Sequence, residues 1–255
     1  LGGVLGIGLG VAILWVIGGV FARAFTEGQG LGVNLSNLAG RGTREILNLS
    51  VTEALGNSLR NMVVAVVISL VIAWWLGRSR AGLVVLLPIG ISPVVIGLGA
   101  LVLSGYVPSA LSGSWLVLPL VQSVFLTPLA FQIIAPARRA LSPDILESAR
   151  LDGANTTQVL GLIELPTLAR PVVVAAALAG LASLGEFGAA SFLAYGSQET
   201  LPLVMFRLMS RPGTENLGMA MTAASIFILI ALLVVWALSF LRSDSDPGRR
   251  DGAPA

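Results

Sequence analysis

The stretch that decides the fold reads Leu141-Ser-Pro-Asp-Ile-Leu-Glu-Ser-Ala-Arg-Leu-Asp-Gly-Ala-Asn-Thr-Thr-Gln-Val-Leu-Gly-Leu-Ile-Glu-Leu-Pro166. Its first residues, Ser142 to Asp144, are typical of a helix start, because they combine a capping hydroxyl, a first-turn proline and an acid at the positive end of the helix dipole. Gly153 is predicted to end this helix, and a second helix is predicted from Asn155 or Thr156 to the final proline. The stretch is therefore predicted to form two short helices joined by a turn, outside the lipid bilayer.

The chain around this stretch is too apolar for a water-soluble protein. Of its 255 residues, 55% are hydrophobic and 11% are charged, whereas a soluble domain carries about 25% charged residues. At roughly 20 apolar residues per spanning helix, the length accommodates six helices with modest loops. We therefore predict an all-α membrane protein with six transmembrane helices.

Uncharged apolar runs define the predicted spans. These are residues 1–22, 61–77, two spans between Arg80 and Arg138 divided by the polar segment 104–114, 171–194 and 216–241. In the third span, Pro88 and Pro93 favour a kink or a broken helix.

By region, the chain is predicted to have four parts. They are a first transmembrane helix (1–24), an external loop with the entry to the core (25–59), a five-helix core (60–241) that contains the cytoplasmic loop 136–170, and a disordered tail (242–255).

The placement of the 15 arginines predicts the orientation of the spans. With the N-terminus in the cytoplasm, nine arginines lie inside and six outside, and four of those six lie in or beside the long loop after the first span, where the positive-inside rule is weak. Trp74 and Trp75 stand just before Arg78, as expected of an aromatic belt at the cytoplasmic headgroups. The quoted stretch between the fourth and fifth spans is therefore predicted to be cytoplasmic.

Missing residue types exclude several classes of enzyme. The sequence contains no His and no Cys, so it cannot build a Ser-His-Asp or Cys-His nucleophile or an imidazole or thiolate metal site. It contains no Lys, so it cannot form a Walker A loop. We therefore expect no catalytic residue, no metal and no cofactor on this chain.

Six residues of the quoted stretch stand at the offsets of a known signature, Glu-Ala-Ala, three residues, Gly, nine residues, Ile-x-Leu-Pro. They are Glu147, Ala149, Gly153, Ile163, Leu165 and Pro166, and Ser148 replaces the first Ala. By this signature the chain resembles the permeases of type I ATP-binding-cassette (ABC) importers. The resemblance implies the type I permease fold and a coupling helix, including Asp152, that docks on a separate ATPase subunit.

The signature residues suit that role. Gly153 permits a tight turn that a side chain would strain, and Glu147 is placed to anchor the loop by charge-assisted hydrogen bonds to arginines or backbone amides. On the residue pattern alone, a helical loop that lies against the membrane surface is the alternative.

The resemblance also implies partners and a location. The expected partners are two ATPase subunits, or a dimer of one, which bind the ATP and Mg²⁺, and a solute-binding protein outside the cytoplasm. A second permease half is expected as well, either the same chain, a sibling or an upstream half of one fused chain, because only one signature is present and the first residue is not Met. The expected location is the inner membrane of a prokaryotic cell.

The cargo is predicted from three segments between residues 183 and 213. Residues 183–194, 200–202 and 206–213 are most similar to permeases of the thiamine and ferric-iron branch, which implies thiamine or ferric iron as the cargo. Sulfate and molybdate permeases share the signature loop, so the loop itself does not decide the cargo.

Glu186 is the one charged residue within the predicted spans. Since a carboxylate in lipid is costly, Glu186 is predicted, with Phe187, to line the translocation path, where it would suit a cation. A salt bridge or a helix-end hydrogen bond that fixes the core is an equally weighted alternative. If Glu186 instead carried a proton, the chain would be an ion- or proton-coupled secondary transporter, although no second titratable group in the membrane accompanies it.

Overall fold

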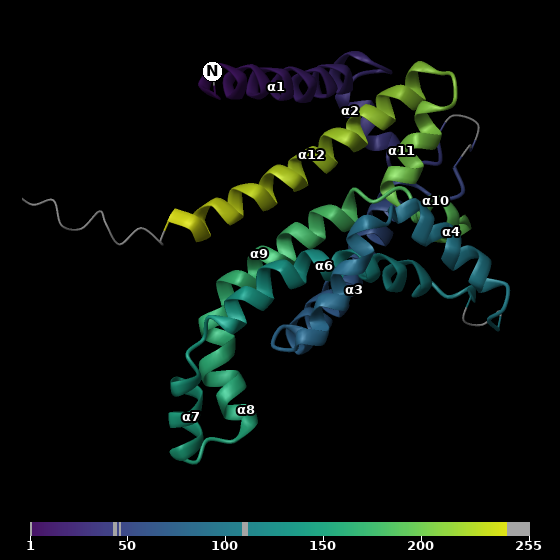
Figure 1. Cartoon of the computed structure of the whole chain (residues 1–255). Helices are drawn as coiled ribbons and strands as arrows, with labels where there is room; N and C mark the ends of the chain where they lie inside the picture. The colour runs from purple at the N-terminus through teal and green to yellow at the C-terminus, as the bar shows by residue number, and fades with distance from the viewer. Residues whose placement is uncertain (1, 43–44, 46, 109–111, 244–255) are drawn as a thin grey trace, which may run out of the picture. The chain divides into compact units, whose positions relative to one another are not determined.

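The computed structural model describes all residues except 1, 43–44, 46, 109–111 and 244–255 (Figure 1). Regular structure in the described part of the chain is entirely helical. The chain forms two compact units. The first unit comprises Leu1–Met62, Pro93–Leu118 and Leu184–Ala231, and the second comprises Val63–Ser92, Pro119–Ser183 and Leu232–Ala255.

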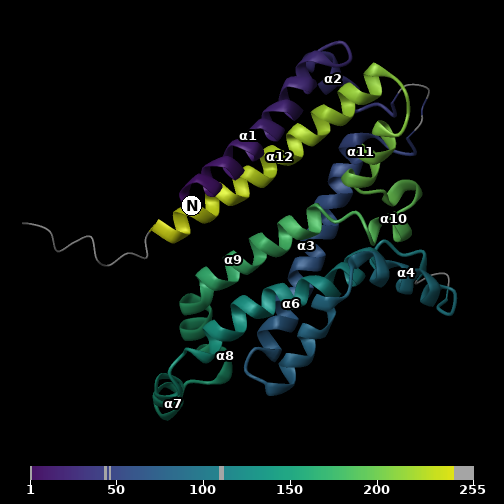
Figure 2. The same ribbon diagram turned by 45° about the horizontal axis from the view of Figure 1, so that its top comes forward.

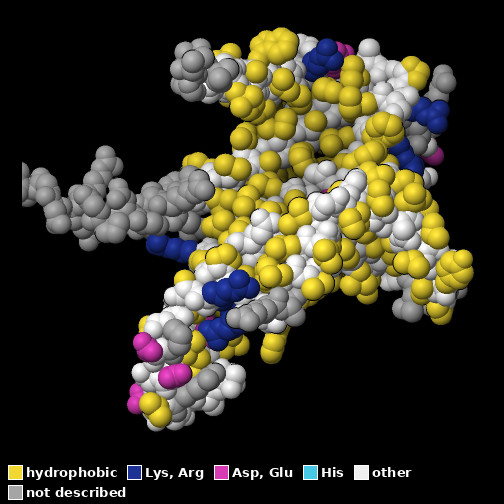
Figure 3. All heavy atoms as spheres, viewed as in Figure 1, with side chains coloured by type: hydrophobic (Ala, Val, Ile, Leu, Met, Phe, Trp, Pro, Cys, Tyr) yellow, Lys and Arg dark blue, Asp and Glu magenta, His cyan; other side chains and the backbone are white. Residues whose placement is uncertain are grey.

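Among the described residues, five helices are long and apolar enough to cross a membrane. They are α1 (Gly2–Thr26), α3 (Val51–Leu76), α6 (Val117–Arg139), α9 (Leu165–Leu184) with the turns that lead into it, and α12 (Thr214–Ser243). A sixth span is counted if the bent pair of the 3-10 helix η2 (Arg80–Gly90) and α4 (Pro93–Ser104) is taken as one. The all-α, six-span prediction is confirmed, and hydrophobic side chains cover most of the face shown in Figure 3.

Shorter helices connect these spans. They are α2 (Leu31–Asn37), α7 (Pro143–Leu151), α8 (Thr156–Val159), the π-helical turn η3 (Leu160–Glu164), α10 (Ala190–Leu193), the 3-10 turn η4 (Gly196–Gln198) and α11 (Leu201–Met209). The predicted tail 242–255 lies, from residue 244 onward, outside the described residues, and α12 reaches Ser243.

The core of the first unit packs the residues before α3 and the start of α3 against α11 and α12. Its buried members are Leu38, Leu47, Leu49, Val51, Ala54, Leu201, Val204, Leu208, Met219, Ala220 and Ala223. Beside this core, the buried Asn34 amide donates to the carbonyls of Ala24 and Glu27 at 3.1 and 2.9 Å. A Cβ on Gly218 would lie 2.7 Å from Asn34 Oδ1, so α12 approaches α2 closely only because position 218 is glycine.

The core of the second unit packs α3, α6 and α9 together. Its buried members are Ala73, Ala130, Phe131, Ile134, Ala135 and Ala175. Helices α6 and α9 lie side by side in both ribbon views (Figures 1 and 2), and the Ser183 hydroxyl near the end of α9 donates to Gln122 Oε1 of α6 at 3.0 Å. Small side chains let these helices pack closely, as is common for spanning helices.

The second span begins ten residues earlier than the predicted start at residue 61. Helix α3 starts at Val51 because Ser50 and Glu53 form a capping box. The Ser50 N–H donates to Glu53 Oε2 at 2.8 Å, and the Glu53 N–H donates to Ser50 Oγ at 3.2 Å. The Ser-x-x-Glu spacing at 50–53 was the sequence signal for this start.

The fifth span differs from the prediction at both ends. It was predicted at 171–194, but α9 ends at Leu184, and a continuous helical path runs into it from Thr156. Pro171 is accommodated inside the helix; a spanning helix tolerates such a proline because neighbouring groups satisfy the freed carbonyl. Glu186 therefore lies after the span and not within it.

The third span is broken, as predicted from its prolines. The 3-10 helix η2 ends at Gly90, and Pro93 occupies the first position of α4, where a missing N–H costs nothing. In α4, a Cβ on Gly97 would lie 2.5 Å from the Cα of Ala189. Gly97 is thus the point at which α4 contacts the backbone before α10.

Candidate coupling loop

The signature stretch folds as the predicted pair of short helices. Helix α7 begins after Ser142, whose hydroxyl accepts a hydrogen bond from the Asp144 N–H at 3.3 Å. The helix ends in a turn in which the Ala154 N–H donates to the Ala149 carbonyl at 2.9 Å, as in a Schellman motif. Gly153 has φ +87°, in the left-handed region that favours glycine. The predicted role of Gly153 in the turn is confirmed.

Asn155 caps the second helix, whose first helical residue is Thr156. Asn155 Oδ1 accepts from the Gln158 N–H at 2.8 Å, and Gln158 Oε1 accepts from the Asn155 N–H at 2.9 Å. This reciprocal capping box satisfies two of the amides that a helix start leaves without an intrahelical partner. The turn between α7 and α8 is therefore defined by local hydrogen bonds on both sides.

Most predicted docking residues lie on the surface of the loop. Glu147, Ser148, Asp152, Gly153, Leu165 and Pro166 are exposed, and Ala149 and Ile163 are half-buried. Large apolar side chains join them, with Ile145, Leu151 and Leu162 exposed to 53%, 89% and 75%. The Ser148 hydroxyl donates to the Asp144 carbonyl at 2.8 Å, so this departure from the signature is accommodated within α7.

The structure does not give Glu147 the anchoring contact that the sequence suggested. Glu147 is exposed, and it has no hydrogen bond or ion pair with any described residue of its own chain. Its carboxylate is accessible to a partner.

The path from α8 into the membrane contains a widened turn. The Leu165 N–H donates to the Leu160 carbonyl, five residues back, which defines the π-helical turn η3. The prediction that the second loop helix ends at Pro166 is wrong, because helix α9 continues through this proline. A proline near the start of a helical segment loses little, since the first amides of that segment have no α-helical partner. Such π turns occur frequently at functional sites.

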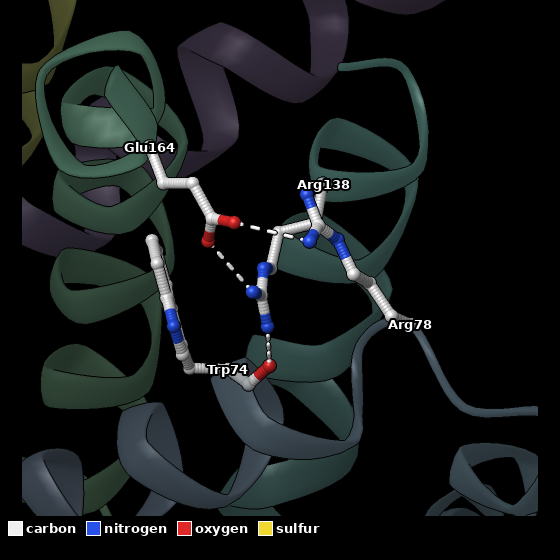
Figure 4. A network of polar contacts seen from close by, with 4 residues as sticks. All are labelled: Trp74, Arg78, Arg138 and Glu164. Carbon is white, nitrogen blue, oxygen red and sulfur yellow. Dashed lines mark hydrogen bonds and ion pairs between the residues drawn. The ribbon is translucent and has the colours of Figure 1, made fainter. Parts of the chain in front are cut away.

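A buried carboxylate at the end of this turn joins three helix ends (Figure 4). Glu164 Oε2 lies 2.7 Å from Arg138 Nη2, and Glu164 Oε1 lies 3.0 Å from Arg78 Nη1. The side chains of Glu164 and Arg138 are 7% and 9% exposed, whereas that of Arg78 is 36% exposed. Each carboxylate oxygen therefore has its own guanidinium, which is the arrangement that makes a buried charge tolerable.

Two arginines of α6 also bind the end of α3. Arg138 donates to the Trp74 carbonyl, and its guanidinium carbon lies 4.5 Å from the centroid of the Trp74 ring. Arg139 Nε donates to the Gly77 carbonyl at 3.0 Å. Cations at a helix C-terminus satisfy its last carbonyls and interact favourably with the helix dipole. The ends of α3 and α6 are thus fastened to each other directly.

The sequence prediction missed Glu164, although the residue lies inside the signature. It occupies the variable position between Ile163 and Leu165, and the arginines 78 and 138 were treated only as markers of orientation. The available signal was the acid itself, which stands next to the predicted membrane entry, together with Arg78 and Arg138, which also border predicted spans.

Glu186 lies in the connection between α9 and α10. Its carboxylate accepts from the Ala189 N–H at 2.6 Å and from the Ala190 N–H at 3.1 Å, and the side chain is buried. Phe187 is partly exposed, and its ring centroid lies 5.3 Å from that of Phe206. The contacts of Glu186 are those of the helix-end hydrogen bond that the sequence analysis weighed against a path-lining role.

The helices define a multi-span membrane protein with a loop of short helices between α6 and α9. Residues 62–244 match the family described as "Binding-protein-dependent transport system inner membrane component", and the chain belongs to that family. It is an inner-membrane permease of the type I ABC importer class, as its signature predicted. The family assignment also confirms that it is a transport subunit and not an enzyme.

Relatives with curated names agree with this assignment. The molybdenum transport system permease protein ModB of Haemophilus influenzae is 30% identical over 206 residues, which cover 74% of this chain and 90% of the relative. The sulfate transport system permease protein CysW of Synechocystis is 28% identical over 234 residues, 85% and 82% of the two chains. A putative 2-aminoethylphosphonate permease protein, PhnV of Salmonella paratyphi A, is 31% identical over 149 residues, 58% and 56% of the chains.

Proposed function

We propose that this permease moves a small oxyanion or phosphonate into the cytoplasm and that its α7–α8 loop docks on the ATPase subunit of the importer. One observation carries the docking part. Before the candidate span that starts at Thr156, the loop exposes two large apolar side chains, Ile145 and Leu151, on a short helix that is followed by a turn fixed by capping hydrogen bonds. Exposed apolar residues on a rigid element are the mark of a protein-binding surface.

Crosslinking tests the docking proposal directly. Because the sequence contains no cysteine, Leu151→Cys provides a unique thiol on the loop for a maleimide–benzophenone crosslinker, whose photoreactive end inserts into C–H bonds of whatever lies beside it. We expect a crosslink between Leu151→Cys and a P-loop ATPase in native membranes. The control is Met209→Cys on α11, which is also exposed but belongs to a segment predicted to lie outside the cytoplasm. Equal crosslinking from both positions, or none from Leu151→Cys, would contradict the proposal.

Substitution of the turn glycine tests whether docking is coupled to transport. A Cβ at position 153 would meet nothing within 4 Å, so a side chain fits there, although φ +87° strains the backbone. We expect Gly153→Asp to leave the protein in the membrane while ATP hydrolysis no longer drives uptake, since a new carboxylate stands in the interface. The matched control is Gly153→Asn, which has the same shape, tolerates this φ and adds no charge. Normal uptake with Gly153→Asp would overturn the assignment of the loop.

The proposal includes the rest of the importer. Two ATPase subunits would bind ATP and Mg²⁺, a second permease half would complete the membrane path, and a solute-binding protein would deliver the cargo. The family description, which refers to a binding-protein-dependent system, supports the last of these. This chain contributes the membrane path and the docking loop and requires no cofactor of its own.

The names of the relatives favour an anionic cargo. The three relatives above are named for molybdenum, sulfate and 2-aminoethylphosphonate transport, and none of these names supports the thiamine or ferric iron predicted from the sequence. That prediction also used the carboxylate of Glu186 as an attraction for a cation. The backbone amides that Glu186 accepts from supply a structural reason for its burial that requires no cation.

Identification of the bound ligand tests the cargo. The permease would be isolated from native membranes in mild detergent with its binding protein, and the retained ligand would be identified by mass spectrometry. We expect an oxyanion or a phosphonate. Thiamine or ferric iron would overturn the cargo proposal and leave the permease assignment intact, whereas isolation of the permease without an ATPase after crosslinking would count against the docking proposal.

The secondary-transporter alternative receives no support from these observations. It required Glu186 to carry a coupling proton, but this carboxylate caps the start of α10, and family membership places the energy source on a separate ATPase.

A further inference from the structure

The coupling loop has two stems, which are separated in the sequence by the two short helices α7 and α8. The first stem is the end of α6, where Arg138 and Arg139 donate to carbonyls of α3. The second stem is the π turn η3, which leads from α8 into α9. Its polar connection to the ends of α3 and α6 is the carboxylate of Glu164.

The π turn brings Glu164 into position for this contact. A π turn contains one residue more than an α-helical turn, so it changes which face of the helix the following residues present. As a result, Glu164 is buried, while its neighbours Leu162 and Leu165 are exposed. The two arginines reach Glu164 from different elements, one from the last turn of α6 and the other from the segment after α3.

The chemistry of the contact makes it stiff. Two charge-assisted contacts, at 2.7 and 3.0 Å, hold the two carboxylate oxygens in different directions, and the ring of Trp74 packs on the Arg138 guanidinium. With Glu164 and Arg138 both shielded from water, solvent screens the attraction little. The carboxylate therefore has little freedom to rotate away from its partners.

We infer that the Arg78–Glu164–Arg138 bridge is the joint that makes the second stem of the coupling loop move together with the ends of α3 and α6. This inference rests on the proposed docking of the loop on an ATPase that displaces it. The chain itself connects the loop only to α6 and α9. Because Arg138 and Arg139 already fasten the end of α6 to that of α3, the bridge adds the second stem to this pair and prevents α9 from hinging separately at the π turn. Glu164 is thus a positioning residue, which acts through the helices it connects.

Spin labels on the two sides of the bridge test this joint. One label would be placed at Val71→Cys on α3, an exposed position, and the other at Gly161→Cys in the π turn, where a Cβ meets nothing within 4 Å. The distance between them would be measured by pulsed electron paramagnetic resonance in the complex with the ATPase, with and without ATP and vanadate. In the otherwise unchanged protein, we expect the same narrow distance distribution in both states.

Loss of the bridge should release the second stem. We expect Glu164→Gln to broaden the distribution and to shift it when ATP and vanadate are added. Arg78→Gln should produce a smaller change in the same direction, and Arg78→Lys, which keeps the charge, should restore the original distribution. Asp144→Asn is the matched control, since it neutralises an exposed acid of α7 that makes no contact with the bridge.

The outcomes separate this inference from the docking proposal. If the unchanged protein does not form a complex with an ATPase, the docking proposal fails first. If the complex forms and the distributions of Glu164→Gln and Arg78→Gln match that of the unchanged protein in both nucleotide states, the joint is wrong. If Glu164→Gln does not fold, Arg78→Gln decides, because it leaves the buried Glu164–Arg138 pair intact.

Discussion

Two buried glutamates, Glu164 in the second unit and Glu199 in the first, differ in how their carboxylate oxygens are paired. Glu164 has one arginine for each oxygen. Glu199 is fully buried, but Arg207, at 2.9 Å, and Asn48 both contact its Oε1. Its Oε2 has no hydrogen-bond partner in the described part of the chain.

The partners differ in burial as well as in number. Arg138 is 9% exposed and cannot turn to solvent, whereas Arg207 is 37% exposed. Loss of Glu199 would leave its arginine in contact with water, while loss of Glu164 would leave a guanidinium buried and unpaired. The loss of stability on removing a buried acid therefore depends on whether its partner arginine can reach solvent.

The contacts around Glu199 explain why this carboxylate can remain buried although one of its oxygens has no hydrogen-bond partner in the described part of the chain. The backbone around it is fixed by other contacts: Asn57 donates to the carbonyls of Ser197 and Glu199 at 2.8 and 3.1 Å, and the Leu201 N–H donates to Ser58 Oγ at 2.9 Å. Glu199 is one of several contacts between the α10–α11 connection and the start of α3, whereas Glu164 is the carboxylate that links the π turn to both Arg78 and Arg138.

The largest expected effect is that of Glu164→Ala. It should destabilise the protein by about 3 kcal/mol, because Arg138 remains buried without its counter-charge. Unfolding in mixed micelles would measure this difference. Glu147→Ala on the exposed face of α7 is the control and should change stability by no more than about 0.5 kcal/mol. Equal losses of stability for Glu164→Ala and Glu147→Ala would show that the buried bridge stabilises the protein no more than an exposed acid does.

Glu199→Ala should have a smaller effect, about 2 kcal/mol, because Arg207 can turn to water and the remaining ties hold the connection. Glu199→Gln should cost about 1 kcal/mol, since its amide oxygen still accepts from Asn48. The same unfolding measurement applies. If Glu199→Ala destabilised the protein more than Glu164→Ala, the exposure of the partner arginine would not be the deciding factor.

Ser58→Ala tests a second contact between α3 and the α10–α11 connection in the first unit. It leaves the buried Leu201 N–H without its acceptor, which should cost about 1 kcal/mol. Ser36→Ala is the matched control, because the Ser36 hydroxyl bonds to a carbonyl of its own helix on the exposed surface. A similar loss of stability in both variants would show that the hydrogen bond from Leu201 to Ser58 stabilises the protein no more than a local hydrogen bond on the surface.

Arg78→Gln should have the smallest effect on stability, about 0.5 kcal/mol. Arg78 is partly exposed, and exposed ion pairs contribute little, while Arg138 continues to neutralise Glu164. A loss as large as that of Glu164→Ala would mean that Arg78, and not Arg138, carries the bridge. A small loss of stability combined with an altered nucleotide response would distinguish the coupling role of Arg78 from a structural one.

Features that depend on short spacings could be predicted from the amino-acid sequence. Composition and uncharged runs gave a helical membrane protein, the prolines of the third span indicated its break, and Ser142, Gly153 and Asn155 marked the turn of the loop. The signature, with its fixed offsets, identified the family. In each case the deciding interactions join residues a few positions apart, as in the bond from Gln158 to Asn155, so that a linear pattern contains them.

The pairing of the charges, in contrast, became visible in the folded chain. Glu164 lies 26 positions from Arg138 and 86 from Arg78, and no periodicity indicates that these three groups meet. The sequence singled out Glu186 as the charge in the membrane, yet the chain ends α9 before it, and its carboxylate caps the next turn. The continuation of the helix through Pro166 likewise depends on a π turn that no residue preference predicts. Contacts between distant segments depend on how whole helices pack. That packing determines which of the several acids and arginines form ion pairs.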